Sequence, residues 1–310
     1  MHQLSVDVII PTYKPDGKLT KLVSLLQNQT YPVQHILILN TDEALWNPEL
    51  IVDYDRVEVF HVEKRDFDHG GTRRLGETFS GADILVYMTH DAMPADRQLI
   101  RHLVRPFQKG NVKASYARQL PAKDCSVIER YTRSFNYPDK SYIKNKEDLP
   151  ELGIKTYFCS NVCAAYDHAT YKELGGFPKN AIFNEDMIYA GHLIQAGYSI
   201  AYCADAQVIH SHNYTGWEQL TRNFDLAVSQ VQNPDVFKNV KSESEGIRLV
   251  KKTAAYLRHI GKGYLILQLI WTSGCKYLGY RLGKIYKHLP FFLVRFFSMN
   301  KSYWDNGRCE

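Results

Sequence analysis

The sequence has no stretch of 18 or more uninterrupted apolar residues, about the length that a helix needs to cross a bilayer. Its six cysteines include no CxxC pair, so free thiols in a reducing cytosol are expected rather than a disulfide framework or a zinc site. Residues 1–7 are largely polar and lead directly into an apolar run, so no signal peptide is expected. These absences favour a globular cytosolic protein over a secreted or membrane-spanning one.

Acidic residues are scarce in the C-terminal part of the chain. Residues 246–310 hold 12 Lys and Arg against 2 Asp and Glu, and no acidic residue lies between Gly246 and Trp304. Residues 1–245 hold 26 basic against 31 acidic residues, so the net charge of +5 hides an acidic body and a basic tail. We expect the tail to meet an anionic partner.

The chain alternates strand-like and helix-like segments, which is typical of an α/β protein. Its length allows one domain of roughly 200 residues and a smaller second unit. A polar segment with two prolines, residues 137–152, is expected to be a mobile flap. Strands are expected at residues 6–10, 35–39, 57–62, 82–89, 113–117, 158–166, 199–203 and 207–210. Helices are expected after Gly17 and at residues 72–79, 99–107, 126–135, 168–174 and 187–195.

Asp91 follows the apolar strand-like run at residues 82–89. Open parallel sheets bind ligands at the carboxyl ends of their strands, so this carboxylate is a candidate ligand for a metal or a phosphate. The alternative is an Asp that opens a turn or caps a helix starting near Ala95.

Three further groups stand at the ends of expected elements. The pair Glu185 and Asp186 precedes a helix, where an acid is also favoured simply by the helix dipole. His210 ends a strand, where a histidine can equally be structural, and His212 is a fallback. Gly70 and Gly71, followed by Arg73, could bring backbone N–H groups to an anion; the alternative is a plain loop with a surface arginine.

These residues carry a resemblance to a known family. The run PTYKPDGKLTKLVSLLQNQTYP at residues 11–32, together with Asp91, the Glu185–Asp186 pair and His210, resembles family 2 glycosyltransferases of the GT-A (nucleotide-diphospho-sugar transferase) fold. FDHGGTR at residues 67–73 and THDA at residues 89–92 resemble, more narrowly, bacterial polysaccharide rhamnosyltransferases. The resemblance covers residues 5–215. It implies a Rossmann-like mixed, mainly parallel sheet in a catalytic domain of residues 1–215, followed by a helical region of residues 216–310.

The resemblance also implies roles for individual residues. Asp186 would be the catalytic base and Glu185 would orient it or the acceptor. Asp91 and His210 would bind Mn²⁺ or Mg²⁺, with Thr89 standing where the DxD motif has its first Asp. Ser160 and Asn161 would contact the acceptor, although a buried strand segment is an equal alternative. The implied donor-binding residues are Pro11, Thr12, Tyr13, Asp42, Gly70, Gly71, Arg73, His90 and Asp91.

The resemblance does not extend to the basic tail, so its function is inferred from its residues alone. Residues 276–289 place Leu278, Leu282, Ile285 and Leu289 on one helical face and Lys276, Arg281, Lys284 and Lys287 on the other; Pro290 and the aromatic run at residues 291–297 follow. This pattern suits an interfacial helix on anionic lipid. The alternative is a helix packed on the catalytic domain with a solvated basic face. A linker is expected near residues 233–246.

The resulting hypothesis is an inverting rhamnosyltransferase that uses dTDP-β-L-rhamnose. Its acceptor would be an undecaprenyl-pyrophosphate-linked saccharide at the cytoplasmic face of the membrane, to which the tail binds peripherally. One alternative is a family 2 transferase of another hexose or N-acetylhexosamine. Another is a catalytically silent scaffold that binds membrane or RNA. Nucleic acid is not an expected partner of the enzyme, and a homodimer is left open.

Overall fold

The computed structural model describes residues 3–52, 54–238, 240 and 243–305 and divides into two compact units. The first unit contains residues 1–120, 137–179 and 185–210, and the second contains residues 121–136, 180–184 and 211–310. The sequence suggested a single boundary after residue 215, whereas these units also place two internal segments with the C-terminal residues. Cys309 lies outside the described residues, and the other five cysteines are free thiols.

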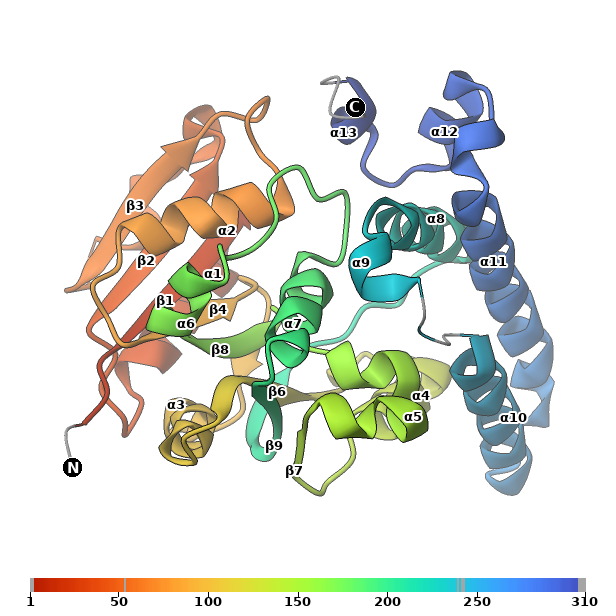
Figure 1. Cartoon of the computed structure of the whole chain (residues 1–310), viewed down its shortest axis with the longest axis horizontal. Helices are drawn as coiled ribbons and strands as arrows, with labels where there is room; N and C mark the ends of the chain where they lie inside the picture. The colour runs from red at the N-terminus through yellow and green to blue at the C-terminus, as the bar shows by residue number, and fades with distance from the viewer. Residues whose placement is uncertain (1–2, 53, 239, 241–242, 306–310) are drawn as a thin grey trace. The chain divides into compact units, whose positions relative to one another are not determined.

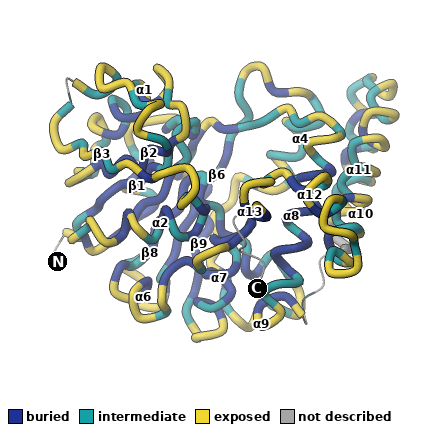
Figure 2. Tube along the Cα trace, turned by 90° about the horizontal axis from the view of Figure 1, so that it is seen from above, coloured by how far each residue is buried: buried dark blue, intermediate teal, exposed yellow. Residues whose placement is uncertain are grey.

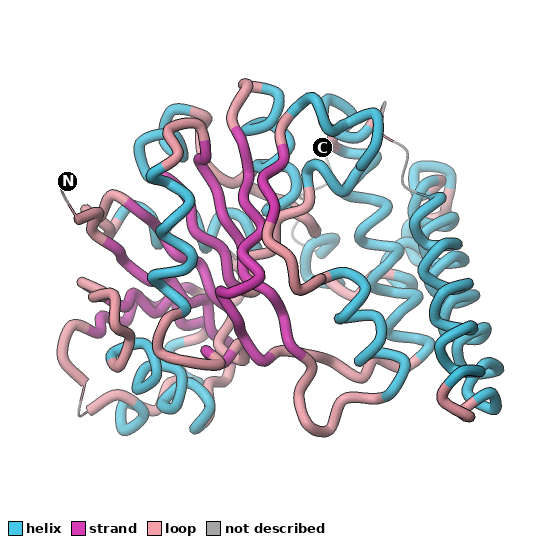
Figure 3. Tube along the Cα trace, turned by 90° about the horizontal axis from the view of Figure 1, so that it is seen from below, coloured by secondary structure: helices cyan, strands magenta, loops and turns pink. Residues whose placement is uncertain are grey.

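The first unit is built on one sheet of nine strands among the described residues (Figure 3). Its order is β3-β2-β1-β4-β8-β6-β9-β5, with β7 paired to β9. Strands β3, β2, β1 and β4 are parallel, and β8 runs antiparallel between β4 and β6, so the expected mixed sheet is confirmed. The strands are β1 Val6–Tyr13, β2 His35–Thr41, β3 Val57–Val62, β4 Ile84–Met88, β5 Met93–Pro94, β6 Val112–Leu120, β7 Tyr142–Lys144, β8 Cys163–Asp167 and β9 Ser199–Ile209.

Helices cover both faces of this sheet. The apolar residues of α1 (Gly17–Gln27) and α3 (Leu99–Val104) share one core with alternate residues of β1 and β4. On the other face, α2 (His69–Thr78) approaches so closely that a Cβ on Gly76 would lie 2.6 Å from Ile9. Figure 1 shows α2, α6 (His168–Glu173) and α7 (Glu185–Gln195) in front of the strands. A buried aromatic cluster on this face contains Tyr87, Tyr166, Tyr171, Phe177 and Tyr189.

The second unit is helical among its described residues. Helices α8 and α11 approach closely where α11 has glycines. Cβ atoms on Gly279 and Gly283 would lie only 2.1 and 2.3 Å from carbonyl oxygens of α8. Tyr131 of α4 stacks on Tyr256 of α10, with ring centroids 4.5 Å apart. Its helices are α4 Val127–Asn136, α8 Gly216–Gln232, α9 Pro234–Phe237, α10 Glu243–His259, α11 Ile266–Lys284, α12 Phe291–Phe297 and α13 Lys301–Asp305. The remaining helix, α5 Leu149–Leu152, belongs to the first unit.

Several expected boundaries were wrong. β1 continues through Pro11, which lies beyond the residues that pair with β4, so its missing N–H costs no ladder bond there. α2 begins at His69 instead of Thr72, because the Asp68 side chain caps it. β9 is one strand where two were expected. Its pairing with β6 has a register irregularity at residues 204–206, between the two expected strands.

Three loop and strand assignments also need correction. No helix starts near Ala95: Met93 and Pro94 form β5, so Asp91 does not cap a helix. The strand expected at residues 158–166 covers only Cys163–Asp167. Residues 137–152, expected to be a flap, contain β7 and α5, and β7 is hydrogen-bonded to β9.

The tail follows its amphipathic pattern only in part: Leu282 and Leu289 pack against the core of the second unit, whereas Ile285 is about half exposed. The buried residues of α11 are Leu269, Gly279 and Gly283, and Leu278 is about half exposed. Lys276, expected on the solvated face, is partly buried near Glu129, and burial lowers its pKa. Figure 2 shows the central strands mostly in dark blue and much of α10 and α11 in teal or yellow. Within the described part of the chain, no helix has the length and apolar character needed to cross a membrane.

Candidate active site

Four expected site residues lie at one edge of the sheet. Thr12 and Tyr13 end β1, and Asp42 follows β2, which pairs with β1 in parallel. Asp91 follows β4, the other parallel neighbour of β1. The carboxyl ends of parallel strands share an edge, so the topology brings these residues together as the sequence predicts.

The β1 end of this edge is aromatic and basic. Thr12 is buried and its hydroxyl donates to Asn40 Oδ1 at 3.2 Å, whereas the Tyr13 ring is exposed. The ammonium groups of Lys14 and Lys64 lie 5.5 and 5.9 Å from the centroid of that ring. Neither lysine was predicted as a site residue, because nothing in their local pattern distinguishes them from solvated surface charges.

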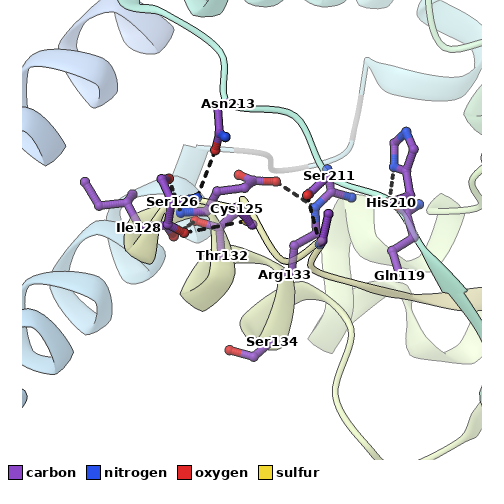
Figure 4. Close-up of polar contacts among 12 residues, drawn as sticks. Gln119, Cys125, Ser126, Ile128, Thr132, Arg133, Ser134, His210, Ser211 and Asn213 are labelled. Carbon is purple, nitrogen blue, oxygen red and sulfur yellow. Dashed lines mark hydrogen bonds and ion pairs between the residues drawn. The ribbon is translucent and has the colours of Figure 1, made fainter. Parts of the chain in front are cut away.

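Asp91 and His210 form the first polar pair. His210 Nε2 lies 3.5 Å from Asp91 Oδ2, and the His210 ring is buried. Its Nδ1 lies 3.1 Å from Gln119 Oε1, the contact drawn in Figure 4. An amide oxygen only accepts, so this contact favours the tautomer with hydrogen on Nδ1 and the Nε2 lone pair toward Asp91.

This pair suits a divalent cation. The two atoms lie close enough to be ligands of one ion, and a carboxylate oxygen with an imidazole nitrogen suits Mn²⁺. Gln119 supplies the outer hydrogen bond that orients a histidine ligand. Thr89 Oγ1 is buried and has no hydrogen-bond partner among the described residues. Of the residues expected in this position, the structure therefore brings Asp91 and His210 together.

Glu185 and Asp186 form the second polar pair, in the first turn of α7. Glu185 Oε1 lies 3.1 Å from Arg73 Nη1 and accepts from Asn161 Nδ2 at 3.2 Å. Asp186 Oδ2 accepts from the Asn161 backbone N–H at 3.1 Å, and Oδ1 accepts from Met187 N at 2.8 Å. Asn161 therefore holds both carboxylates.

The two carboxylates have opposite pKa shifts. Burial by itself would raise the pKa of Glu185, but Arg73, His69 and the Asn161 amide outweigh it and lower the pKa below its ordinary value. Burial and the neighbouring Glu185 charge raise the pKa of Asp186 to about 7. An ionised Glu185 beside a partly exposed Asp186 that binds a proton near neutrality is a suitable arrangement for a general base.

Arg73 does not extend into an open phosphate site in this structure. It is buried, pairs with Glu185 and donates from Nη1 to the His69 carbonyl at 2.9 Å. Burial lowers the pKa of His69 despite the opposing effect of Glu185. His69 was not predicted as part of this network, because the helix was expected to begin three residues later, at Thr72.

Gly70 and Gly71 have packing explanations. A Cβ on Gly70 would lie 1.9 Å from the Pro178 carbonyl oxygen, and one on Gly71 would lie 2.3 Å from Asp68 Oδ2. The Gly71 N–H already donates to Asp68 Oδ1 at 2.7 Å. The anion that meets this helix N-terminus is therefore a side chain of the protein.

Ser160 and Asn161 connect the two polar pairs. Ser160 Oγ accepts from Gln119 Nε2 at 3.1 Å, and Gln119 contacts His210. Asn161 is buried, and Tyr166 donates to its Oδ1 at 2.9 Å. Cys159 is buried, and burial raises the pKa of its thiol to about 12, so it is no nucleophile at neutral pH.

One family model and two curated relatives match this chain. The family model described as glycosyl transferase family 2 matches residues 7–175. The chain is 38% identical to the O-antigen chain rhamnosyltransferase RfbN of Salmonella typhimurium strain LT2, over 98% of this chain and 97% of RfbN. It is 36% identical to the O-antigen chain rhamnosyltransferase WbaN of Salmonella anatum, over 97% and 96% of the two chains.

Solved structures match the fold. The mannosyltransferase PcManGT from Pyrobaculum calidifontis, in complex with GDP-Man and Mn²⁺, gives a TM-score of 0.57 at 14% identity, over 98% of this chain and 86% of that one. S. aureus TarS residues 1–349 gives 0.57 at 14% identity, over 98% and 89%. These likenesses confirm the expected GT-A fold.

Proposed function

Since the chain belongs to glycosyltransferase family 2, we propose that it is an inverting rhamnosyltransferase that uses dTDP-β-L-rhamnose. The observation that carries the proposal is Asp186: a partly exposed carboxylate with a pKa raised to about 7, held by Asn161 beside the ionised Glu185. The identity of 38% with an O-antigen chain rhamnosyltransferase supports L-rhamnose as the transferred sugar.

Asp186 acts as the base in this mechanism. The acceptor hydroxyl oxygen attacks the anomeric carbon, Asp186 takes the hydroxyl proton, and the nucleoside diphosphate leaves from the opposite face. This single displacement inverts the configuration, so no second nucleophilic carboxylate is needed. Glu185 keeps Asp186 basic by its charge and remains ionised because Arg73 neutralises it.

Asp91 and His210 would hold Mn²⁺ or Mg²⁺. A bound divalent cation would offset the charge that develops on the departing diphosphate. Gln119 fixes the His210 tautomer, and the otherwise unpaired Thr89 hydroxyl supports a ligand near this edge. His212 lies two residues after His210 in the sequence and is a candidate for a third ligand.

The donor nucleotide would occupy the strand-end edge. Pro11, Thr12, Tyr13 and Asp42 keep their proposed donor roles there, together with the partly exposed His90. Lys14 and Lys64 add positive charge beside the Tyr13 ring. The contacts of Gly70, Gly71 and Arg73 favour structural roles instead, because each is already engaged by the protein.

Ser160 keeps the proposed acceptor contact, and Asn161 is better explained as the residue that positions both carboxylates. The acceptor would be an undecaprenyl-pyrophosphate-linked saccharide. Residues 1–215 would supply catalysis and residues 216–310 would bind the cytoplasmic face of the membrane. Exposed aromatic residues near basic ones, such as Trp271 and Phe292, support that assignment.

The test is a transfer assay with purified protein and Mn²⁺. It uses a panel of sugar nucleotides that includes dTDP-β-L-rhamnose and a synthetic lipid diphosphate saccharide as acceptor. We expect a product heavier by one α-linked rhamnose. Preferential use of another hexose or N-acetylhexosamine would change the donor assignment, and a β-linked product would exclude single displacement.

A further inference from the structure

Lys144 is a charged side chain in the interior of the first unit. It lies on β7 (Figure 1), is only 1% exposed and pairs in register with Ile200 of β9. Its ammonium donates to the Lys155 carbonyl at 2.8 Å and to the Phe158 carbonyl. The ammonium also lies 4.9 Å from the Tyr116 ring centroid. Both carbonyls belong to the turn that ends immediately before Cys159.

Burying this amine is costly, and the structure compensates for it mainly with carbonyls and aromatic faces. Burial lowers the pKa of Lys144 to about 7, with Asp148 favouring the charged form and Lys155 opposing it. The Asp148 carboxylate accepts from the Asn145 N–H at 2.7 Å. An apolar side chain of the same length could fill this space without that desolvation cost, so stability alone does not explain a lysine here.

The segment that Lys144 holds leads directly to the candidate active site. Ser160 contacts Gln119, which contacts His210 of the metal pair. Asn161 contacts Glu185 and Asp186. Residues 158–161 therefore form one short connection, anchored at one end by Lys144, that touches the supports of both polar pairs.

We propose that Lys144 is a positioning residue: by holding the Lys155 and Phe158 carbonyls, it fixes residues 158–161 and thereby the Glu185–Asp186 carboxylates. The role assigned to those carboxylates rests on the proposed function. A neutral amine keeps two N–H donors, so this positioning persists on both sides of the Lys144 titration. Changes in the pH profile should therefore report Asp186.

The pKa of Asp186, measured from the acid limb of the pH–rate profile, distinguishes this positioning role from a general packing role. The groups whose charge acts on Asp186 are Glu185 and Arg73, and the ionisable groups of Tyr166 and Cys159 also face it. The Asn161 N–H opposes the raised pKa of Asp186 by donating to its carboxylate. Displacing Asn161 removes that donor, raises the pKa further and moves the acid limb of the rate profile to higher pH.

The experiment compares Lys144→Met with Lys146→Met. Methionine keeps the length of the side chain but donates no hydrogen bond, and Lys146 is an exposed lysine two residues further on. We expect Lys144→Met to lower kcat about 10- to 100-fold, the effect of a small misplacement of reacting groups, and to move the acid limb to higher pH. Lys146→Met should match the wild type in both. A folded Lys144→Met variant with wild-type kcat and acid limb would overturn the proposal.

If Lys144→Met does not fold, hydrogen–deuterium exchange of the wild-type protein tests the proposal instead. In the wild-type protein, residues 155–161 should exchange as one unit with β7, since Lys144 joins them. Exchange of residues 158–161 that is independent of β7 would overturn the proposal. If the wild-type protein turns over no sugar nucleotide, the proposed function fails, and the exchange measurement still decides the role of Lys144.

Discussion

Arg73 and Glu185 in the first unit are both less than 10% exposed and lie 3.1 Å apart, whereas Trp271 and Phe292 in the second unit are 68% and 69% exposed. Each arrangement is unfavourable on general grounds. Charges taken out of water need compensation from partners, and large apolar side chains left in water gain nothing from folding. The first unit therefore contains a buried network of paired charges, and the second unit exposes large aromatic side chains on its surface.

This difference separates two kinds of experiment. Substitutions in the first unit should change the chemistry and its pH dependence whatever the physical form of the acceptor. Substitutions on the exposed face of the second unit should matter only when the acceptor is in a membrane.

Asp186→Asn should have the largest effect on turnover. The amide keeps the shape of the carboxylate but cannot take the acceptor proton, so kcat should fall by about 10² to 10⁴-fold while donor binding stays nearly intact. The measurement is steady-state transfer to a short soluble acceptor, with donor affinity from calorimetry. Asp205→Asn, an exposed Asp on β9, is the control. More than half of wild-type turnover in Asp186→Asn would remove this residue from the mechanism.

The same residue predicts a pH dependence in the wild-type enzyme. Because its pKa is raised to about 7, the ionised base is depleted below that pH, and kcat should fall about tenfold per unit there. The effect on stability has the opposite sign, because it is the protonated form of Asp186 that the folded protein favours. The folded protein binds the Asp186 proton more tightly than the unfolded chain does, so this group favours folding at acidic pH and loses that contribution as pH rises through about 7.

Glu185→Gln should act mainly on stability. It leaves the buried Arg73 without its carboxylate, and breaking a buried pair in this way costs about 3–5 kcal/mol of unfolding free energy. It should also move the acid limb to lower pH, because the Glu185 charge helps to raise the pKa of Asp186. Urea unfolding and the pH–rate profile measure the two effects. The exposed Glu173→Gln is the control, and equal midpoints for the two variants would contradict the burial argument.

The strand-end residues could be predicted from the sequence, and the network around them could not. Asp91 was located correctly because a buried apolar run followed by a polar residue is a local pattern. Gln119 contacts His210 across 91 residues of sequence, and Asn161 contacts Asp186 across 25. No hydrophobic period encodes such contacts, because they arise only when β6, β8, β9 and α7 assemble.

Arg73 illustrates how one misplaced boundary changes a functional assignment. Starting the helix at Thr72 left Gly70 and Gly71 in a loop and suggested an open anion site. The Asp68 cap starts the helix at His69, places Gly71 against that carboxylate and turns Arg73 toward Glu185. The mixture of Asp, His and two glycines before Thr72 gave no periodic apolar signal, so the extra turn was not visible.

Gln119→Leu should weaken metal binding without removing a ligand. Loss of the hydrogen bond to His210 leaves the ring tautomer and orientation unfixed, which typically costs about 10- to 100-fold in metal affinity or activity. Mn²⁺ titration by calorimetry and the metal dependence of turnover measure it. Gln207→Leu, on β9 and bonded to the Ala204 carbonyl at 3.3 Å, is the matched control. Turnover that is unchanged by excess EDTA would show that Asp91 and His210 hold no essential metal.

Reversal of three basic residues near the end of α11 should leave the chemistry intact and reduce membrane binding. Arg281 and Lys287 are exposed and Lys284 is partly exposed. Each positive charge near an anionic leaflet contributes about 1 kcal/mol, which salt screens. The variant Arg281→Glu, Lys284→Glu and Lys287→Glu should sediment less with anionic vesicles at low salt and act less on lipid-linked acceptor. Its turnover of a short soluble acceptor should equal that of the wild type.

The control must separate a local surface from net charge. Lys251, Lys252 and Arg258 are exposed on α10, and their reversal to Glu changes the net charge equally. Truncation after Gly246 is a poorer design, because Tyr131 stacks on Tyr256 and the cut would remove that packing.

A larger loss for the α11 variant would locate the membrane surface beside the exposed aromatic residues, since their insertion adds a component that salt does not screen. Equal losses would mean that net charge alone attracts the protein. Sedimentation of the α11 variant at the wild-type level would show that its basic residues are solvated or packed in a dimer, and the membrane assignment would fail.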